Sequence, residues 1–574
     1  MRKRIISALT IMLSLCLLLS ACSGGTGTSP GGEPTQSPTA NAQSGSKVTA
    51  PGVFPVYEGD PVTLRIFNNA EESILISDFS YDKNDFTKFI CDKPGVNIEW
   101  IEARSNALEK LNLLLASNDL PDIVFSTMSP EMQLTYGSQG ILMPVEDLLL
   151  ENMYYFKDVL EADPELLNKY RMADGNVYCV PKTMGAYEIA YEQFCMINKT
   201  WLDNLGLSMP ETVDDLRNVL QAFKDQDPNG NGKADEIPFL GYKDAESPGE
   251  AWAFLMFPFI YHDGQYSTLI NKSGSEAFPA FTQEEWKAGL KYQNELFKAG
   301  LLDPESFTID RTQARQLMVQ DDALVGVIAT KAPHHVMDPS SDRIHDYVYL
   351  PPLKGPDGEA RHMYNPDIPK IGDTYFRVAI TSACKEPEIA IRFLDAFYDP
   401  ETSQSVQYGV KDVDWRYGKE GEVGINGEPA KWVPLNQVWG AEQTKAWDLA
   451  GPCWWPWEWR YGEIVKDPDK NYNGSYTMFN AAKNIYAPYA DEDSHFPQNL
   501  NFMLDEVEEA VSLKTDIYSY VEQATAQFII GERNLESDWD SYLKDLDRYG
   551  LDRWMELQLA AYERQYGEKL TYKK

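Results

Sequence analysis

The chain has 574 residues, of which 43% are hydrophobic, and its 88 acidic against 51 basic side chains give a net charge of −37. A prior of about 150 residues per domain suggests two to four domains. The charge excludes nucleic acid and an anionic membrane surface as binding partners, since both are polyanions.

The first residues have the parts of a secretion signal. Residues 1–4 (MRKR) form a positively charged start, residues 5–19 form a mainly apolar core, and Leu19-Ser20-Ala21-Cys22 is a small-residue cleavage site. These four residues resemble the bacterial lipobox, whose cysteine is diacylated and becomes the first residue of the mature protein. We therefore expect a signal peptide at 1–22, a lipid (palmitate) anchor on Cys22 and a position at the extracellular face of the cell membrane. The alternative is an ordinary signal peptide with an incidental cysteine.

The residues after the signal should form a flexible tether, because 23–57 are rich in Gly, Ser, Thr and Pro and offer little to bury. Of the seven cysteines, Cys16 and Cys22 belong to the signal. The others are spaced widely and irregularly, which predicts no disulfide framework.

Strand and helix patterns alternate from residue 62 onward. Apolar and β-branched runs at 62–67, 96–101 and 122–126 predict strands, with helical patterns near 85–91 and at 105–116 between them. This alternation predicts a parallel α/β sheet, whose ligands bind beyond the carboxyl ends of the strands. Asn69 and Ser126 follow such ends and are candidate ligand-binding residues, although each is also an ordinary loop residue.

Residues 225–236, with the sequence DQDPNGNGKADE, match the EF-hand pattern and have the chemistry of a calcium loop. A register that begins at Asp225 and one that begins at Asp227 both fit. The residues that follow, Ile237-Pro238-Phe239, cannot continue as a helix, so the second EF-hand helix is missing and a structural ion is favoured. The alternative is a solvated turn. The preferred register takes its ligands from Asp227, Asn229, Asn231, the carbonyl of Lys233, Asp235 and Glu236.

A second α/β unit begins at the strand predicted for 194–198 and continues into a helix that starts at Thr212, the N-cap of a capping box. Several short runs here and elsewhere occur in a characteristic order: LPDIV at 120–124, INKTWL at 197–202, LGL at 205–207, PET at 210–212, DEIP at 235–238, FRVAITS at 376–382 and FIIG at 528–531. Together with the signal and the lipobox, they resemble the extracellular solute-binding proteins, family 1, of ABC importers. The likeness is to the large lipoproteins of Gram-positive bacteria.

That resemblance implies an α/β, two-lobed fold of the type II periplasmic-binding-protein kind, with lobes joined by crossover hinge segments. Lobe one is expected to hold 58–185 and 345–400, and lobe two 186–344 and 401–574. The chain would bind an oligosaccharide between the lobes.

Aromatic side chains are the natural platforms for sugar rings, and the chain has 14 Trp and 32 Tyr. The run CWWPWEWRY at 453–461 places four tryptophans within six residues, which no regular periodicity could bury together. Candidate ligand-binding residues are therefore Trp252, Tyr261, Trp415, Trp455, Trp457 and Glu458. A loop that plugs the interface between lobes is the alternative for the run, and burial in the core is the alternative for the rest.

Enzyme signatures are scarce, with no phosphate-binding loop and no H-E-x-x-H. We expect a monomeric, calcium-stabilised receptor without enzymatic activity that delivers an oligosaccharide to ABC permease subunits and touches the membrane only through its lipid. The alternatives are a surface glycan-degrading enzyme or lyase, and an accessory receptor for a sensor system.

Overall fold

The structure is a computed structural model. It describes residues 47–72, 84–117, 119–244, 249–264, 268–366, 373–436, 445–447, 452–467, 472–498 and 500–574. The signal peptide, Cys22 and most of the expected tether lie outside these ranges.

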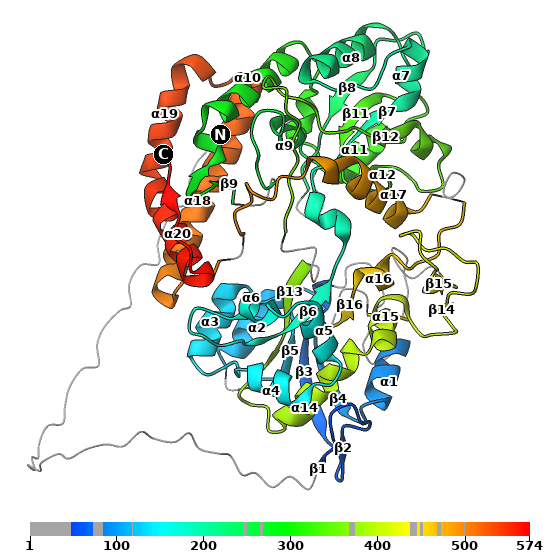
Figure 1. Ribbon diagram of the computed structural model, residues 1–574, viewed down its shortest axis with the longest axis vertical. Coiled ribbons are helices and arrows are strands. Elements are labelled where there is room, and N and C mark those ends of the chain that lie inside the picture. Colours follow the sequence, from blue (N-terminus) through cyan, green and yellow to red (C-terminus); the bar gives the residue numbers. More distant parts are fainter. Residues whose placement is uncertain are drawn as a thin grey trace, which may run out of the picture. The chain divides into compact units, whose positions relative to one another are not determined.

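The first α/β part is built on a six-stranded sheet with the order β16-β6-β13-β5-β3-β4 (Figure 1). Its strands are β3 (Thr63–Asn69), β4 (Asn97–Ala103), β5 (Ile123–Phe125), β6 (Cys179–Met184), β13 (Asp373–Ile380) and β16 (Trp454–Trp455). β3 pairs in parallel with β4 and β5, as the alternating pattern predicts, whereas β13 is antiparallel to both of its neighbours.

Helices cover both faces of this sheet, because successive side chains of a strand point to opposite sides. Ile66 packs into one hydrophobic cluster and Phe67 into another. The Phe67 cluster includes α2 (Ala107–Leu115) and α3 (Pro130–Ser138). The Ile66 cluster includes α1 (Asp85–Asp92), α4 (Glu146–Asn152), α5 (Phe156–Ala162), α6 (Leu166–Tyr170), α14 (Pro387–Asp395) and α15 (Pro400–Tyr408).

The second α/β part is built on a four-stranded sheet with the order β12-β7-β11-β8. The strands are β7 (Cys195–Asn198), β8 (Ile237–Leu240), β11 (Val325–Ala329) and β12 (Tyr347–Tyr349). The core around it includes α7 (Lys199–Leu205), α8 (Val213–Asp225), α9 (Ala251–Met256), α10 (Glu284–Lys298), α11 (Arg311–Met318) and α12 (Pro333–Val336). α8 begins with the expected capping box, in which Thr212 accepts from the Asp215 amide and Asp215 accepts from the Thr212 amide.

Three C-terminal helices, α18 (Leu504–Ile530), α19 (Leu535–Arg548) and α20 (Leu551–Tyr566), pack against one another and against α10 (Figure 1). Next to them, β10 (Glu276–Pro279) pairs with β9 (Ile270–Ser273) and with β17 (Thr571–Tyr572). α18 joins two cores: its Val507 packs into the cluster with Phe67, and its Phe528 packs into the core of the second sheet.

The chain crosses between the two large sheets three times. Residues 185–194 lead from β6 to β7. The second crossing follows β12 and is described from residue 350 to residue 366, and the third follows β16 through α16 (Trp457–Arg460) toward α17 (Gly474–Ala481). The expected division placed 347–349 with the first sheet and 454–455 with the second. β12 lies in the second sheet and β16 in the first, because each strand is only two or three residues long and its partner is distant in sequence.

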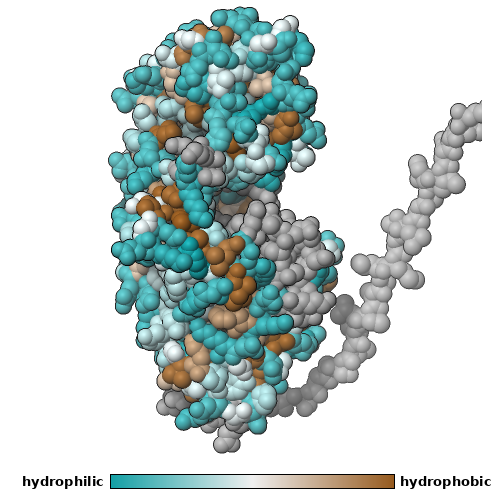
Figure 2. All heavy atoms as spheres, turned by 90° about the vertical axis from the view of Figure 1, so that its right-hand side faces the viewer, coloured by the Kyte–Doolittle hydropathy of each residue, from teal (hydrophilic) through white to brown (hydrophobic). Residues whose placement is uncertain are grey.

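The start of the described chain is folded. β1 (Lys47–Val48) pairs with β2 (Tyr57–Glu58), and the connecting residues pack on the first α/β part, where the Phe54 ring stacks on Tyr155. Residues 47–57 therefore form a hairpin where the sequence predicts a tether. Among the described residues, no helix combines the length and apolar character needed to cross a membrane. One face of the molecule is mostly hydrophilic, with hydrophobic side chains in smaller groups (Figure 2), as the acidic composition predicts.

Candidate functional site

The three crossings bring aromatic side chains together. Tyr187 comes from the first crossing, and its ring centre lies 5.2 Å from Trp457 of the third and 5.5 Å from Phe479 of α17. Tyr191 also belongs to the first crossing and lies 5.1 Å from Tyr364 of the second. We call Tyr187, Tyr191, Tyr364, Trp457, Tyr461 and Phe479 the hinge aromatic cluster.

Several members of this cluster are only partly buried, namely Tyr187, Tyr364 and Trp457. The indole N–H of Trp457 finds no acceptor within the part of the chain that the structure describes. The hydroxyls of Tyr187 and Tyr191 lie 3.1 Å apart. The partly exposed rings of Tyr187, Tyr364 and Trp457 thus offer apolar faces of the kind on which a sugar ring packs, whereas the indole N–H of Trp457 is itself buried.

A buried ion pair lies under these rings. Glu188 is 2% exposed; one of its oxygens lies 3.3 Å from an Arg460 nitrogen, and the other accepts from the Tyr461 hydroxyl. The same hydroxyl accepts from the Tyr187 amide at 2.6 Å. Glu188 and Arg460 therefore fix the first crossing to the third, and each satisfies the charge of the other.

A second carboxyl group lies nearby on the third crossing. Burial raises the pKa of Glu463 to about 7, although a hydrogen bond from Asn473 and the charge of Arg460 both favour its ionised form. Burial thus favours the protonated form of this carboxyl, which can donate a hydrogen bond as well as accept one.

Asn69 and Ser126, predicted from the strand ends, lie side by side. Asn69 Nδ2 donates to Ser126 Oγ at 3.2 Å, because β3 and β5 are parallel neighbours whose carboxyl ends meet at one edge. Both residues are almost fully buried.

The predicted aromatic residues are divided among several environments. Trp415 is fully buried in the core of the first sheet, where its indole N–H donates to the Gly409 carbonyl at 3.0 Å. Trp455 is 2% exposed in the same core and donates to Gln404. Trp252 packs in the core of the second sheet, and its indole donates to Glu250.

The other predicted residues lie closer to the crossings. The Tyr261 hydroxyl donates to the Tyr364 carbonyl at 3.3 Å, which places Tyr261 behind the hinge aromatic cluster. Trp457 is a member of the cluster, and Glu458 beside it is exposed and forms an ion pair with Lys431 at 2.8 Å. The sequence reasoning did not select Tyr187, Glu188, Tyr191 or Tyr364. Their only local signal is the pair of tyrosines four residues apart, which share one face of a helical turn.

The acidic loop after α8 is held together by hydrogen bonds among its own residues. Asp227 has a positive φ of 47°, and its two carboxylate oxygens accept from the amides of Asn231 and Gly232 at 3.1 and 3.0 Å. Asn231 Nδ2 contacts an Asp235 oxygen at 3.1 Å. The side chains of the Asp227 register therefore converge.

Glu236 completes the loop. Its Oε1 is buried without a hydrogen-bond partner among the described residues. Burial, followed by the charges of Asp235 and Asp227, raises the pKa of its carboxyl. Within the described ranges, no group of three or more His, Cys, Asp or Glu side chains is placed to hold a metal ion, so Asp227, Asp235 and Glu236 do not form a closed carboxylate cage in this structure. One unpartnered Glu236 oxygen, beside the hydrogen-bonded carboxylates of Asp227 and Asp235 and the amide oxygens of Asn229 and Asn231, is oxygen-donor chemistry of the kind that a hard cation such as Ca²⁺ takes.

Residues 75–404 match the model of the family "Bacterial extracellular solute-binding protein". The chain belongs to this family. A fructooligosaccharide ABC transporter substrate-binding protein, FusA of Streptococcus pneumoniae serotype 4, is 29% identical over 487 residues, which cover 83% of this chain and 86% of that protein. The polygalacturonan/rhamnogalacturonan-binding protein YtcQ of Bacillus subtilis is 25% identical over 320 residues, which cover 54% of this chain and 59% of that protein.

The solved structure of S. pneumoniae FusA in complex with kestose superposes with a TM-score of 0.71 at 26% identity and covers 88% of this chain and all of that chain. A second FusA structure, of an EF-hand mutant in complex with fructo-nystose, superposes with a TM-score of 0.70. These solute-binding proteins have two domains, so the expected two-lobed α/β fold class and the resemblance to family 1 are confirmed.

Proposed function

We propose that this chain is the substrate-binding protein of an ABC importer, and that it captures an oligosaccharide at the hinge aromatic cluster and delivers it to permease subunits. The observation that carries the proposal is the convergence of partly exposed aromatic rings from all three crossings onto one place. A ligand held there would contact side chains of all three crossings. Its binding would therefore favour the conformation in which these side chains lie together. The relatives that bind oligosaccharides support the same role. The protein performs no chemistry on its ligand and acts as a monomer.

The charges around the cluster favour a neutral sugar. Arg460 is paired with Glu188, and Lys331 is paired with Glu192 at 3.1 Å. A uronic acid would have to displace one of these carboxylates. Lys483 lies 5.4 Å from the centre of the Phe479 ring, but it is exposed, so water screens its charge.

The ligand site includes other residues predicted from sequence. Glu458, next to Trp457 in the chain, is proposed to supply a polar group beside the rings, and Tyr261 supports Tyr364 from behind. Asn69 and Ser126 remain candidates from their place at the strand ends. Trp252, Trp415 and Trp455 support the site from the cores in which they pack, and do not stack on the sugar.

Calcium is proposed as a structural ion held by Asp227, Asn229, Asn231, the Lys233 carbonyl, Asp235 and Glu236. Its charge would relieve the repulsion among the three carboxylates and fix the loop between α8 and β8. The EF-hand mutant made of FusA supports a metal loop in relatives.

The lobes are proposed to follow the sheets. Lobe one takes 47–185 and 373–455, and lobe two takes 186–349 and 474–574, with the crossings between them as hinges. The signal peptide and lipidation of Cys22 remain proposals that rest on the sequence, and they place the protein at the extracellular face of the membrane.

Isothermal titration calorimetry on a chain that begins after Cys22 tests the function. A panel of neutral oligosaccharides should contain a ligand, and Trp457→Ala should weaken that ligand about 10- to 100-fold, because the variant loses the apolar area that the indole buries against the sugar and a ring contact of about 0.5–1.5 kcal/mol. Tyr154→Ala is the matched control, since Tyr154 is an exposed aromatic residue outside the cluster. Turnover of a glycan, or no binding by any saccharide, would contradict the proposal.

A further inference from the structure

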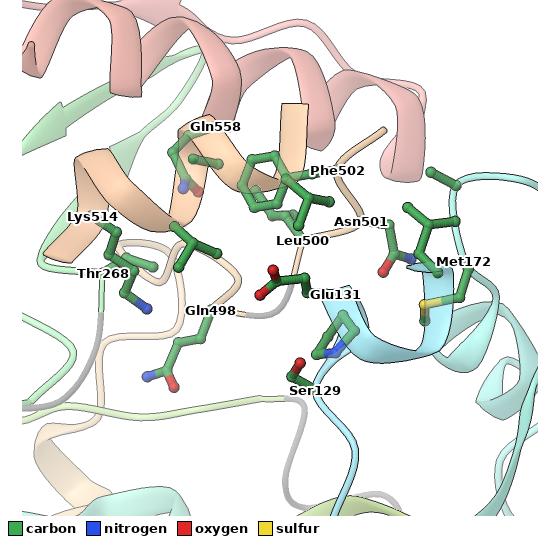
Figure 3. Close-up of a pocket in the computed structure, with 16 residues that line it drawn as sticks. Ser129, Glu131, Met172, Thr268, Gln498, Leu500, Asn501, Phe502, Lys514 and Gln558 are labelled. Atoms are coloured by element: carbon green, nitrogen blue, oxygen red, sulfur yellow. The ribbon is translucent and has the colours of Figure 1, made fainter. Parts of the chain in front are cut away.

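A pocket of about 170 Å³ lies where α3 meets α18 and α20, outside the hinge aromatic cluster (Figure 3). Its volume is close to that of a cavity that holds benzene, about 150 Å³. None of the residues that line it belongs to the cluster, and none has a role in the proposed function.

The walls of the pocket are mainly apolar. It is lined by Leu134 of α3, by Val507 of α18 and by Met172, which follows α6. Each of these side chains is at least nine-tenths buried, within the core that also contains Phe67. Ala510 and Ala173 line it as well, and their small side chains leave the space open. A wall of this kind accepts an aliphatic or aromatic group of a ligand.

One polar side chain points into this apolar space without a partner. Gln558 of α20 is 4% exposed, and Figure 3 shows its amide directed into the pocket. No hydrogen bond to this amide occurs among the residues that the structure describes. The amide faces the space of the pocket, so a ligand that fills the pocket must offer it a hydrogen bond in place of water.

Two opposite charges lie on different walls of the pocket. Glu131 comes from α3 and Lys514 from α18 (Figure 3). Both side chains are exposed, and neither forms an ion pair within the described ranges. The ammonium of Lys514 lies 5.7 Å from the centre of the Tyr518 ring. The surrounding protein replaces part of its water and lowers its pKa, although Asp263 acts in the opposite direction.

We propose that this pocket binds a small zwitterion with an apolar side chain, the chemistry of an apolar amino acid. Its carboxylate pairs with Lys514, its ammonium pairs with Glu131, and its side chain occupies the space between Leu134, Met172 and Val507. Gln558 hydrogen-bonds to the bound polar group. Because one wall comes from α3 and the other from α18 and α20, such a ligand joins the first α/β part to the C-terminal helices.

Three probes of similar shape test the charges separately. L-leucine carries both charges, 4-methylpentanoate carries only the carboxylate, and 3-methylbutylamine carries only the ammonium. In titration calorimetry with the full mature chain, L-leucine should bind about tenfold or more tightly than either other probe, because each lost charged contact removes about one tenfold step. Equal affinities for the three probes, or no saturable binding of L-leucine, would refute the proposal.

Variants locate the binding. Lys514→Met and Glu131→Gln should each weaken L-leucine about tenfold, and Ala510→Leu should abolish its binding by filling the pocket. The first two residues are exposed, so these variants should fold normally, and all three should bind a neutral oligosaccharide as the parent chain does. If that oligosaccharide competes with L-leucine, the pocket is an end of the sugar site and the separate site is disproved. Loss of oligosaccharide binding alone would contradict only the proposed function.

Discussion

Phe257 packs between two buried histidines. Its ring centre lies 4.1 Å from His262, with the rings almost parallel, and 4.7 Å from His362. Nε2 of His262 lies 2.9 Å from the carbonyl oxygen of Ala253, and Nε2 of His362 lies 2.9 Å from that of Glu192. Burial lowers the pKa of His262 to about 3 and that of His362 to about 4. Both rings are therefore neutral in the folded protein at neutral pH.

These histidines should make the protein less stable in mild acid. Their pKa values in the folded protein lie below the ordinary value of 6.5, so the unfolded chain binds protons first as the pH falls. Their stabilisation is complete above pH 6.5 and is lost toward pH 3–4. Each histidine should cost about 2 kcal/mol between pH 6.5 and 5, at about 1.4 kcal/mol per pH unit.

Urea unfolding at pH 7 and pH 5 measures this loss of unfolding free energy. The variant His262→Gln distinguishes the contribution of this histidine from that of the carboxylates, which also titrate in acid. The variant should show a smaller difference between the two pH values, because one titrating group is missing. A variant with the same pH dependence as the parent chain would show that His262 is not responsible.

At the scale of single residues, the sequence could predict residue types better than their environments. Trp415, Trp455 and Trp457 look equivalent in sequence, yet the first two are core residues and the third joins the hinge aromatic cluster. The burial of Trp455 depends on β16, whose partner β6 is about 270 residues away in sequence, and that of Trp415 depends on the core on which β14 (Trp415–Tyr417) packs. Tyr187 and Glu188 could not be selected, because their partners lie on the other crossings.

The loop between α8 and β8 allows the two calcium registers to be separated. Asp225 is the last residue of α8, and its carboxylate accepts from Gln221 at 2.6 Å, whereas Asp227 and Asp235 face Asn231. Asp227→Ala and Asp235→Ala should remove the calcium-dependent rise in melting temperature. Asp225→Ala, the matched control, should retain it.

Thermal unfolding with calcium and with a chelator measures the effect. At a free calcium concentration of 100 times Kd, the parent chain should gain about 2.7 kcal/mol. Loss of the calcium response in Asp225→Ala, with retention in Asp227→Ala, would instead support the register from Asp225.

The N-terminal hairpin should contribute to folding stability. Arg392 is fully buried beside Asp395, and its Nη2 donates to the carbonyls of Ala50 and Val53 at 3.1 and 3.0 Å. A chain that begins at residue 59 loses both acceptors and leaves a buried cation partly unsatisfied. It should lose about 3 kcal/mol or more, as measured by urea unfolding against a chain that begins at residue 47. Equal unfolding midpoints for the two chains would contradict this role.

Elements with strong local signals could be predicted from the sequence. β3, β4, β5 and α8 occur where apolar periodicity and the capping box at Thr212 place them. The hairpin at 47–58 could not be predicted, because its composition is that of a linker and its order comes from contacts with Tyr155 and Arg392. Short strands such as β16 are missed for the same reason, since their partners and not their own residues make them strands.

For the whole molecule, the family could be predicted from the order of short sequence runs. The order of the strands within the six-stranded sheet could not. An antiparallel β13 between β5 and β6 requires the chain to return to its first sheet after completing the second. No local periodicity reports such a return. The place where the crossings meet is therefore also hidden in the sequence, although it holds the candidate ligand site.

The net charge of −37 predicts how ligand binding should respond to salt. A neutral oligosaccharide gains nothing from the electrostatic field of the protein. Its Kd should therefore change less than about twofold between about 20 mM and 0.5 M salt, a range over which the screening length falls several-fold.

An oligosaccharide of uronic acids is repelled by the same field and finds Arg460 already paired with Glu188. It should bind at least about 100-fold more weakly at low salt, with the difference decreasing as salt is added. Titration calorimetry with neutral and acidic oligosaccharides of equal length checks both expectations. Tight binding of the acidic member that weakens with salt would show that an unpaired cation, such as Lys483, directs recognition instead.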